Sequence, residues 1–253
     1  MVRQAKPKKL LVIADGPRPH VPGESKKCEE ARSIIDSDVD WECEIIKNYS
    51  NENLGCGLRP ASGIQWAFDQ VEEAIVLEDD CVPNPTFFRF CEELLDQYRN
   101  DPRIFHISGT NYQLGKKRTR YSYYFSRHPH CWGWASWRRA WKSYDFQMEK
   151  WLELRNTTWL EELHQSKAIA NYWRTKFDKV IENPNLDVWD YQLALNCWIN
   201  NGLSIIPNQN LISNVGFNKE ATHTSSEKSP YARMLTQPIK FPLQHPNFIE
   251  CNQ

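Results

Sequence analysis

Short apolar runs alternate with stretches of helical periodicity along the first half of the chain. Residues 9–14 and 74–77 are nearly continuous apolar runs of strand length, and polar or turn-forming residues follow each of them. Residues 85–98 place apolar side chains on one face at a period of about 3.6, which predicts an amphipathic helix. Pro85 suits the first turn of that helix, where its missing N–H is not needed. Short strands separated by helices predict β-α-β units and an α/β fold.

The same pattern extends over the whole chain. Strands are predicted at residues 9–14, 42–46, 74–77, 104–108, 121–126 and 203–207, and helices at 24–35, 62–71, 85–98, 168–182 and 189–200. Because crossover helices join parallel neighbours, we expect a mostly parallel central sheet flanked by helices, with ligands at the carboxyl ends of its strands. The tail from residue 222 is polar and proline-rich, which predicts a loop or an ordered flap. No repeat or low-complexity linker divides the chain, so we expect one domain over residues 1–253.

Composition narrows the class of protein. Lys plus Arg number 31 against 32 Asp plus Glu, which gives a net charge of -1. Nucleic-acid clamps and polybasic membrane binders need an excess of cations, so we expect no nucleic-acid partner. The longest apolar run near the start, residues 10–14, is too short for a membrane span or a signal-peptide core. We therefore expect a cytoplasmic protein with no membrane span, for which peripheral membrane contact stays open.

Two familiar kinds of site are disfavoured. The eight cysteines include no C-x-x-C pair, which argues against structural zinc. Gly55-Cys56-Gly57 lacks the third glycine of a dinucleotide-binding loop, and no G-x-x-x-x-G-K-[ST] motif occurs. A dehydrogenase or a P-loop enzyme is therefore disfavoured, and a nucleotide must be bound by another device.

Three consecutive acids offer such a device. Glu78, Asp79 and Asp80 directly follow the strand predicted at residues 74–77, where an α/β sheet commonly holds its ligands. Adjacent carboxylates repel one another, and a hard cation such as Mg²⁺ or Mn²⁺ relieves that repulsion while keeping coordination positions open for a diphosphate. The alternative is a solvated acidic turn that stabilises the N-terminus of the following helix. On spacing alone both interpretations stand.

The neighbouring residues add a resemblance to a family. Residues 75–83, Ile-Val-Leu-Glu-Asp-Asp-Cys-Val-Pro, resemble the acidic metal motif of GT-A glycosyltransferases, especially the E-D-D of N-acetylglucosaminyltransferase I-like enzymes. Upstream, Asn53-Leu54-Gly55, Arg59 and residues 66–69 look like the segment before that motif. Residues 131–137 are similar to the W-G-W acceptor-side segment of bacterial family 2-like glycosyltransferases, and residues 189–192 resemble the late motif that holds the catalytic base. In this order the pieces span residues 8–225, nearly the whole chain.

The resemblance implies a role for each matching position. The nucleotide part of a nucleoside-diphosphate sugar, with UDP favoured, would be bound by Asp15, Arg18, Asn53, Gly55, Arg59, Glu78 and Asp79. Asp80 would ligate Mn²⁺ or Mg²⁺, and His223 would be an additional ligand of the metal or the diphosphate. Asp190 would deprotonate the acceptor hydroxyl, which favours inversion by a single displacement. A wall against the acceptor or the donor sugar would be formed by Trp132, Gly133 and Trp134.

The same resemblance implies a division of the single domain. Residues 1–110 would form its nucleotide-binding half, residues 111–225 its acceptor-side half, and residues 226–253 a C-terminal tail. Residues 142–185 match no motif, and acceptor choice is expected to lie there.

Each role has a structural alternative. Asp15 in Asp-Gly-Pro is typical of a turn, and Asp190 begins a predicted helix, where it would serve as a cap. Arg18 and Arg59 also suit the surface. A lone histidine such as His223 commonly belongs to a loop or a core. The tryptophans would serve packing equally well.

We therefore interpret the sequence as a metal-dependent glycosyltransferase that acts on a glycan or glycoconjugate acceptor. Two other functions stay open. A non-catalytic carbohydrate-binding protein would need the tryptophans but not the four acids Glu78, Asp79, Asp80 and Asp190. A sugar nucleotidyltransferase would keep the fold, but its glycine-rich signature and lysine are missing from residues 15–20.

Overall fold

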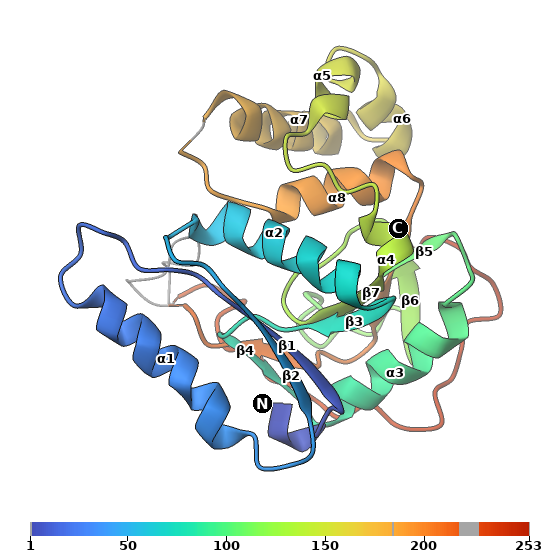
Figure 1. The fold of residues 1–253 in the computed structure, drawn as a ribbon. Helices are drawn as coiled ribbons and strands as arrows, with labels where there is room; N and C mark the ends of the chain where they lie inside the picture. The colour runs from blue at the N-terminus through green and yellow to red at the C-terminus, as the bar shows by residue number, and fades with distance from the viewer. Residues whose placement is uncertain (1, 184, 218–227, 253) are drawn as a thin grey trace.

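Helices and strands largely alternate up to residue 108, as the apolar pattern predicts, whereas three strands and then five helices follow one another among the described residues between 104 and 199 (Figure 1). The computed structural model describes residues 2–183, 185–217 and 228–252. The strands are β1 (Lys9–Ala14), β2 (Glu44–Tyr49), β3 (Glu73–Val76), β4 (Cys81–Pro83), β5 (Ile104–Ser108), β6 (Tyr123–Ser126), β7 (Trp134–Trp137), β8 (Leu203–Pro207) and β9 (Ile212–Asn214). The helices are the 3-10 helix η1 (Val2–Gln4), α1 (Glu24–Asp38), α2 (Gly55–Gln70), α3 (Thr86–Tyr98), α4 (Arg138–Trp141), α5 (Glu149–Leu154), α6 (Trp159–His164), α7 (Lys167–Glu182) and α8 (Asp190–Ile199). The fold is α/β.

The strands form three sheets. β1 and β2 are a parallel pair, and helix α1 makes the crossover between them. The central sheet has five strands in the order β3-β7-β5-β8-β6. Within the described residues, its β5–β8 pairing is parallel, whereas β3–β7, β5–β7 and β6–β8 are antiparallel. β4 and β9 form a separate antiparallel pair. The structure therefore has a mixed central sheet and does not show the mostly parallel one that we expected.

Strand β7 is the main reason for this difference. All four of its residues are buried, so its sequence lacks the alternation of apolar and polar positions that marks a half-exposed strand. β7 lies between β3 and β5 and runs antiparallel to both. The sequence predicts β3 and β5 as parallel neighbours, because a helix connects them. In the structure a strand of opposite direction, β7, lies between the two.

Apolar clusters pack against both faces of the central sheet. Ala135 and Trp137 of β7 belong to a cluster with the buried face of α3, whereas Trp134 belongs to a cluster with α2, α7 and α8. Alternate residues of a strand point to opposite faces, so the two clusters lie on opposite sides of the sheet. Helix α3 therefore covers one face, and α2 with the later helices covers the other (Figure 1).

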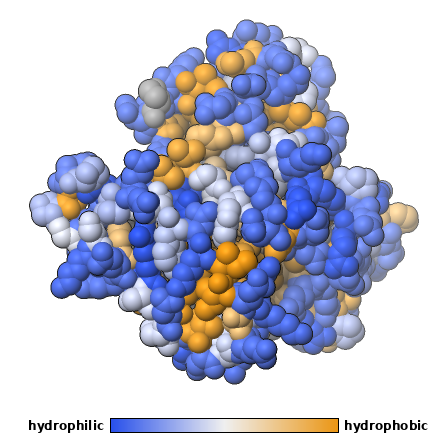
Figure 2. All heavy atoms as spheres, viewed as in Figure 1, coloured by the Kyte–Doolittle hydropathy of each residue, from blue (hydrophilic) through white to orange (hydrophobic). Residues whose placement is uncertain are grey.

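The N-terminal β1-α1-β2 unit is packed less tightly than the rest. From residue 2 to residue 54 no side chain is buried, and neither apolar cluster includes a residue from this range. Helix α1 lies at the edge of the molecule, on the left in Figure 1. Figure 2 shows apolar atoms at the surface over β1 and β2. This unit forms one side of the site described next.

Candidate functional site

A cavity of about 1350 Å³ lies between the N-terminal unit and the central sheet. Its lining includes residues 12–15, Arg32, Tyr49, Arg59, residues 76–80, Trp132, Lys176, Lys179, residues 188–191 and residues 214–216. Side chains of consecutive strand residues point to opposite faces of a sheet, so a cavity over one face would contact only every second residue. This cavity borders three consecutive residues of β1, residues 12–14, and also the end of β3. The cavity therefore meets β1 and β3 at their edges and extends past their carboxyl ends, where the predicted acids lie.

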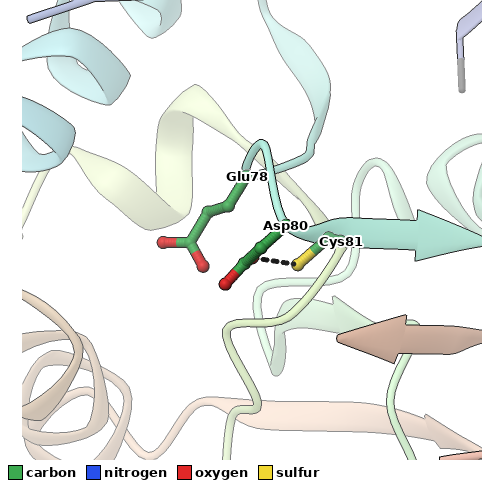
Figure 3. A group of neighbouring side chains, drawn as sticks. All are labelled: Glu78, Asp80 and Cys81. Atoms are coloured by element: carbon green, nitrogen blue, oxygen red, sulfur yellow. Dashed lines mark hydrogen bonds between the residues drawn. The ribbon is translucent and has the colours of Figure 1, made fainter. Parts of the chain in front are cut away.

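The acids Glu78, Asp79 and Asp80 form a turn directly after β3 and border the cavity. The amide of Cys81 donates to the carbonyl of Glu78 at 3.1 Å and closes the turn. The amide of Val215 donates to the carbonyl of Asp80 at 2.9 Å and ties the turn to the segment after β9. Figure 3 shows the carboxylates of Glu78 and Asp80 close together, with the Cys81 thiol beside Asp80. One ligand atom from each of these three side chains lies within 4.8 Å of the others.

Glu78 of this turn has a strongly raised pKa. Burial raises its pKa to about 8, and the negative charges of Asp80, Asp190 and Asp79 add to the rise. A hydrogen bond with Trp189 acts in the opposite direction. The coupling shows that Asp190, the first residue of α8, lies near the acidic turn although it is distant in sequence. Neighbouring carboxylates that disfavour the charge on Glu78 in this way favour a cation between them.

The donor atoms of the turn suit a hard divalent cation. Carboxylate oxygens, here from Glu78 and Asp80, are the ligands that Mg²⁺ and Mn²⁺ prefer. Burial and the neighbouring carboxylates raise the pKa of the Cys81 thiol far above its ordinary value. The thiol therefore stays protonated, and it donates to Asp80 Oδ1 at 3.4 Å. Glu78 and Asp80 would hold the cation, and Cys81 orients Asp80.

Two carboxylates cap the N-terminus of helix α2. A helix leaves its first four amides without a partner inside the helix. Asp15 and Asp187 accept all four: Leu54 N and Gly55 N donate to Asp15 at 2.9 Å each, and Cys56 N and Gly57 N donate to Asp187 at 2.6 and 2.7 Å. With both carboxylates in place, these amides are engaged and do not offer a phosphate site.

This cap changes the interpretation of Asp15, Asn53 and Gly55. Asp15 borders the cavity, but its carboxylate holds the start of α2 and also accepts from Asn53 Nδ2 at 2.9 Å. Asn53 is exposed and is not part of the cavity lining. Gly55 has φ +83°, and a Cβ there would overlap the Asp187 carboxylate. These three residues shape the loop before α2, and the nucleotide contact expected of them stays a prediction.

The predicted arginines occupy different places. Arg59 is only 7% exposed, borders the cavity, and donates to the carbonyl and side chain of Asn48. Arg18 lies on the surface, where it pairs with Glu24 and keeps 54% of its side chain exposed. Arg18 does not line the cavity, and its contact with the nucleotide stays a prediction. Arg32, which the sequence did not single out, borders the cavity and donates to the carbonyls of Asp15 and Ser50 at 2.8 and 2.6 Å.

The tryptophan segment is divided between the cavity and the core. Trp132 is half-buried and lines the cavity. Trp134 is fully buried and stacks on Trp141 and Trp189, each at a centroid distance of 5.9 Å. A fully buried indole cannot stack on a sugar, so the predicted acceptor wall is wrong for Trp134. Gly133 has φ +59°, and a Cβ there would overlap the side chain of Ile212, so this glycine permits close packing.

Asp190 combines both positions considered for it. It is the first residue of α8, as a capping residue would be, and it borders the cavity, as a catalytic base would. The preceding Val188 and Trp189 are buried. Gln192 Nε2 donates to the carbonyl of Val188 at 3.0 Å, and the Tyr144 hydroxyl donates to the carbonyl of Trp189 at 2.9 Å. The backbone before Asp190 is thus firmly held.

Several residues of the site were missed or cannot be placed. Asp187 has no sequence signal, because its partner Cys56 lies 131 positions away. Lys176 and Lys179 do have a sequence signal, since a spacing of three places them on one face of the predicted helix 168–182. His223 lies outside the described residues, so its role as a ligand stays a prediction.

Comparisons with known proteins add no relative. No protein-family model matches the chain, and no curated protein matches it. Among the residues that the structure describes, no helix combines the length and the apolar character that crossing a membrane requires. A functional assignment therefore depends on the chemistry of the cavity.

Proposed function

We propose that the chain is a divalent-metal-dependent glycosyltransferase of the GT-A type. It would transfer a sugar from a nucleoside-diphosphate sugar, with UDP favoured, to a hydroxyl of a glycan or glycoconjugate. The observation that carries this proposal is the convergence of Glu78, Asp80 and Asp190 on one large cavity at the end of β3. The resemblance of residues 75–83 and 189–192 to GT-A motifs points to the same three acids.

The donor would be bound between the acidic turn and the arginines. Glu78 and Asp80 would hold Mn²⁺ or Mg²⁺, which neutralises the charge that grows on the departing diphosphate. Arg59 and Arg32 add fixed positive charge at the cavity wall. Both guanidinium groups are already anchored to main-chain carbonyls, so little reorganisation is needed when a ligand binds.

The acceptor would be activated by Asp190. A carboxylate that borders the cavity beside the acidic turn can accept a proton from a hydroxyl as that hydroxyl attacks the anomeric carbon. A single displacement of this kind inverts the anomeric configuration. Trp132 contributes an aromatic surface at the cavity on which a sugar ring can pack.

The placement of the tryptophans disfavours the non-catalytic alternative. Trp134, Trp137 and Trp141 are at most 2% exposed. Most of the tryptophan-rich segment therefore stabilises the core instead of forming a sugar-binding surface. A carbohydrate-binding protein would also give no reason for acids of the turn after β3 and of α8 to meet in one cavity.

Calorimetric titration of UDP, first with Mn²⁺ and then with EDTA, tests the proposed function. We expect binding that requires the metal. Asp80→Ala should abolish it, because Asp80 supplies a ligand. Asp190→Asn should leave UDP affinity unchanged and stop sugar transfer, because the amide cannot accept the proton.

A matched variant controls for the loss of an acid in general. Asp96→Ala removes a carboxylate on α3 that is 77% exposed and lies outside the cavity, so it should change neither binding nor transfer. The proposal would be contradicted if no nucleotide binds in the presence of Mn²⁺ when UDP, GDP, CMP and dTDP are each tested. Near-normal transfer by Asp190→Asn would exclude Asp190 as the base.

A further inference from the structure

The cavity has a second charged wall that the proposed chemistry leaves without a role. Lys176 and Lys179 of α7 border the cavity beside Tyr191. Their spacing places both on one face of the helix. In the described part of the chain neither lysine forms an ion pair with a carboxylate. Two cations without an acidic partner therefore face a space that already holds several carboxylates.

Contacts with aromatic rings hold Lys176 in place. Its Nζ lies 5.3 Å from the ring centroid of Tyr172 and 5.8 Å from that of Tyr191. Trp173 packs edge-on against both tyrosines, with centroid distances of 5.5 and 6.1 Å. The aromatic cluster fixes the direction of the lysine stem, so the ammonium group stays at the cavity wall.

The position of Lys176 relates it to the acceptor. Lys176 packs on Tyr191, which directly follows Asp190 in α8, and all three residues border the cavity. A general base works within about 2.6–3.2 Å of the hydroxyl that it deprotonates, and the side chains around Asp190 therefore contact the acceptor. The donor diphosphate would have its counter-charge in the metal held by Glu78 and Asp80.

We infer that the acceptor is an anionic glycan, whose carboxylate or phosphate group binds Lys176 and Lys179 while its hydroxyl meets Asp190. This inference rests on the proposed function. Glu78, Asp80 and Asp190 repel an anion at the part of the cavity that they line. The lysine pair is therefore the part of the acceptor side that can bind an anion. Because both lysines lie within residues 142–185, the inference gives this segment a role in acceptor choice.

A panel of carboxylated, phosphorylated and neutral oligosaccharides tests this inference. The panel is probed with the full chain in the presence of UDP and Mn²⁺. Each anionic oligosaccharide that binds is then titrated by calorimetry beside its carboxyl-reduced or dephosphorylated twin, which tells the two sources of the anion apart. We expect the anionic form to bind at least about tenfold more tightly than its neutral twin.

Variants of the lysines assign this preference to the site. The double variant Lys176→Gln/Lys179→Gln keeps much of each stem and removes both charges, so it should lose the preference for the anionic twin. Lys167→Gln removes a lysine of the same helix that does not line the cavity, and it should keep the preference.

The affinity for UDP separates the ways in which the inference can fail. We expect the double variant to bind UDP with Mn²⁺ as the unmodified protein does. A loss of about tenfold or more would assign the lysines to the donor and overturn the inference, while the glycosyltransferase proposal stands. Binding of neutral oligosaccharides only, or of none, overturns it as well. If the unmodified protein binds no nucleotide, the proposed function fails and the inference falls with it.

Discussion

His106 in β5 is a buried histidine that stacks on a tryptophan. It is fully buried, and neither ring nitrogen has a hydrogen-bond partner within the described structure. Its ring stacks on Trp134 at a centroid distance of 5.2 Å. Burial, with a smaller effect of His130, lowers the pKa of His106 to about 3. The unfolded chain takes up this proton below about pH 6.5, so stability is retained above that pH and lost as the pH falls toward 3.

Replacing His106 by Phe should remove this acid sensitivity and keep a ring against Trp134. His106→Phe should raise the free energy of unfolding relative to the unmodified protein. This increase should be about 2 kcal/mol larger at pH 5 than at pH 8. Urea unfolding at the two pH values measures the difference. His20→Phe, at an exposed position, is the matched control for the exchange of a histidine for a phenylalanine. An equal effect of His106→Phe at both pH values would mean that the folded protein protonates His106.

Acidic residues of the site were easier to predict than its aromatic ones. Glu78, Asp80 and Asp190 reach the cavity because an acid at the end of a buried strand, or at the start of a helix, lies at the rim of an α/β core. Trp132 and Trp134 are two positions apart, yet one borders the cavity and the other is in the core. Their difference depends on which elements cover each residue, and no local pattern contains that information.

Helix α2 shows the same limit at the scale of an element. The apolar pattern predicts a helix at 62–71, whereas α2 begins at Gly55. Two glycines in the first turn and Pro60 within the helix disfavour helix formation locally. The carboxylates of Asp15 and Asp187 supply the partners that the first turn needs, and both come from distant parts of the chain.

Removal of the Asp187 carboxylate should therefore weaken the start of α2. Asp187→Ala leaves two helix amides without their acceptor, and the loss of such a cap costs about 2 kcal/mol of stability at the upper end of measured cases. Urea unfolding measures this loss. Asp69→Ala removes an acid near the other end of the same helix, where a negative charge is not favoured, so it should be neutral or slightly stabilising. Equal, small effects of both variants would contradict the proposed cap.

Across the whole molecule, the α/β class was predictable and the sheet was not. The alternation of apolar runs and helical stretches gave the strands at 9–14, 104–108 and 203–207 with their observed bounds. The pairing of strands depends on β7, which is buried at all four positions and joins two strands that are distant in sequence. The separation of β1 and β2 from the central sheet is also a tertiary property. The sequence of β1 has the apolar pattern of an ordinary buried strand, so it does not distinguish β1 from a strand of the central sheet.

The separate N-terminal pair should be the least stable part of the sheet structure. β1 and β2 pair with one another alone among the described strands, and none of their side chains is buried. β5 and β8 lie inside the central sheet, with largely buried side chains. Local opening needs less free energy where few apolar contacts must break. Amide hydrogen exchange should therefore be at least about tenfold faster in β1 and β2 than in β5 and β8.

Ligand binding should change this pattern in a defined place. The cavity lies between the edges of β1 and β3, so UDP with Mn²⁺ would contact both the N-terminal unit and the acidic turn. Exchange at residues 12–15 and 76–80 should slow when both are added, whereas the buried amides of α3, which do not border the cavity, should keep their rates and serve as the internal control. Uniform exchange across all strands in the free protein would contradict the loose packing of the N-terminal unit. Protection confined to α7 and α8 would place the nucleotide on the acceptor side of Asp190 and reverse the assignment of the two walls.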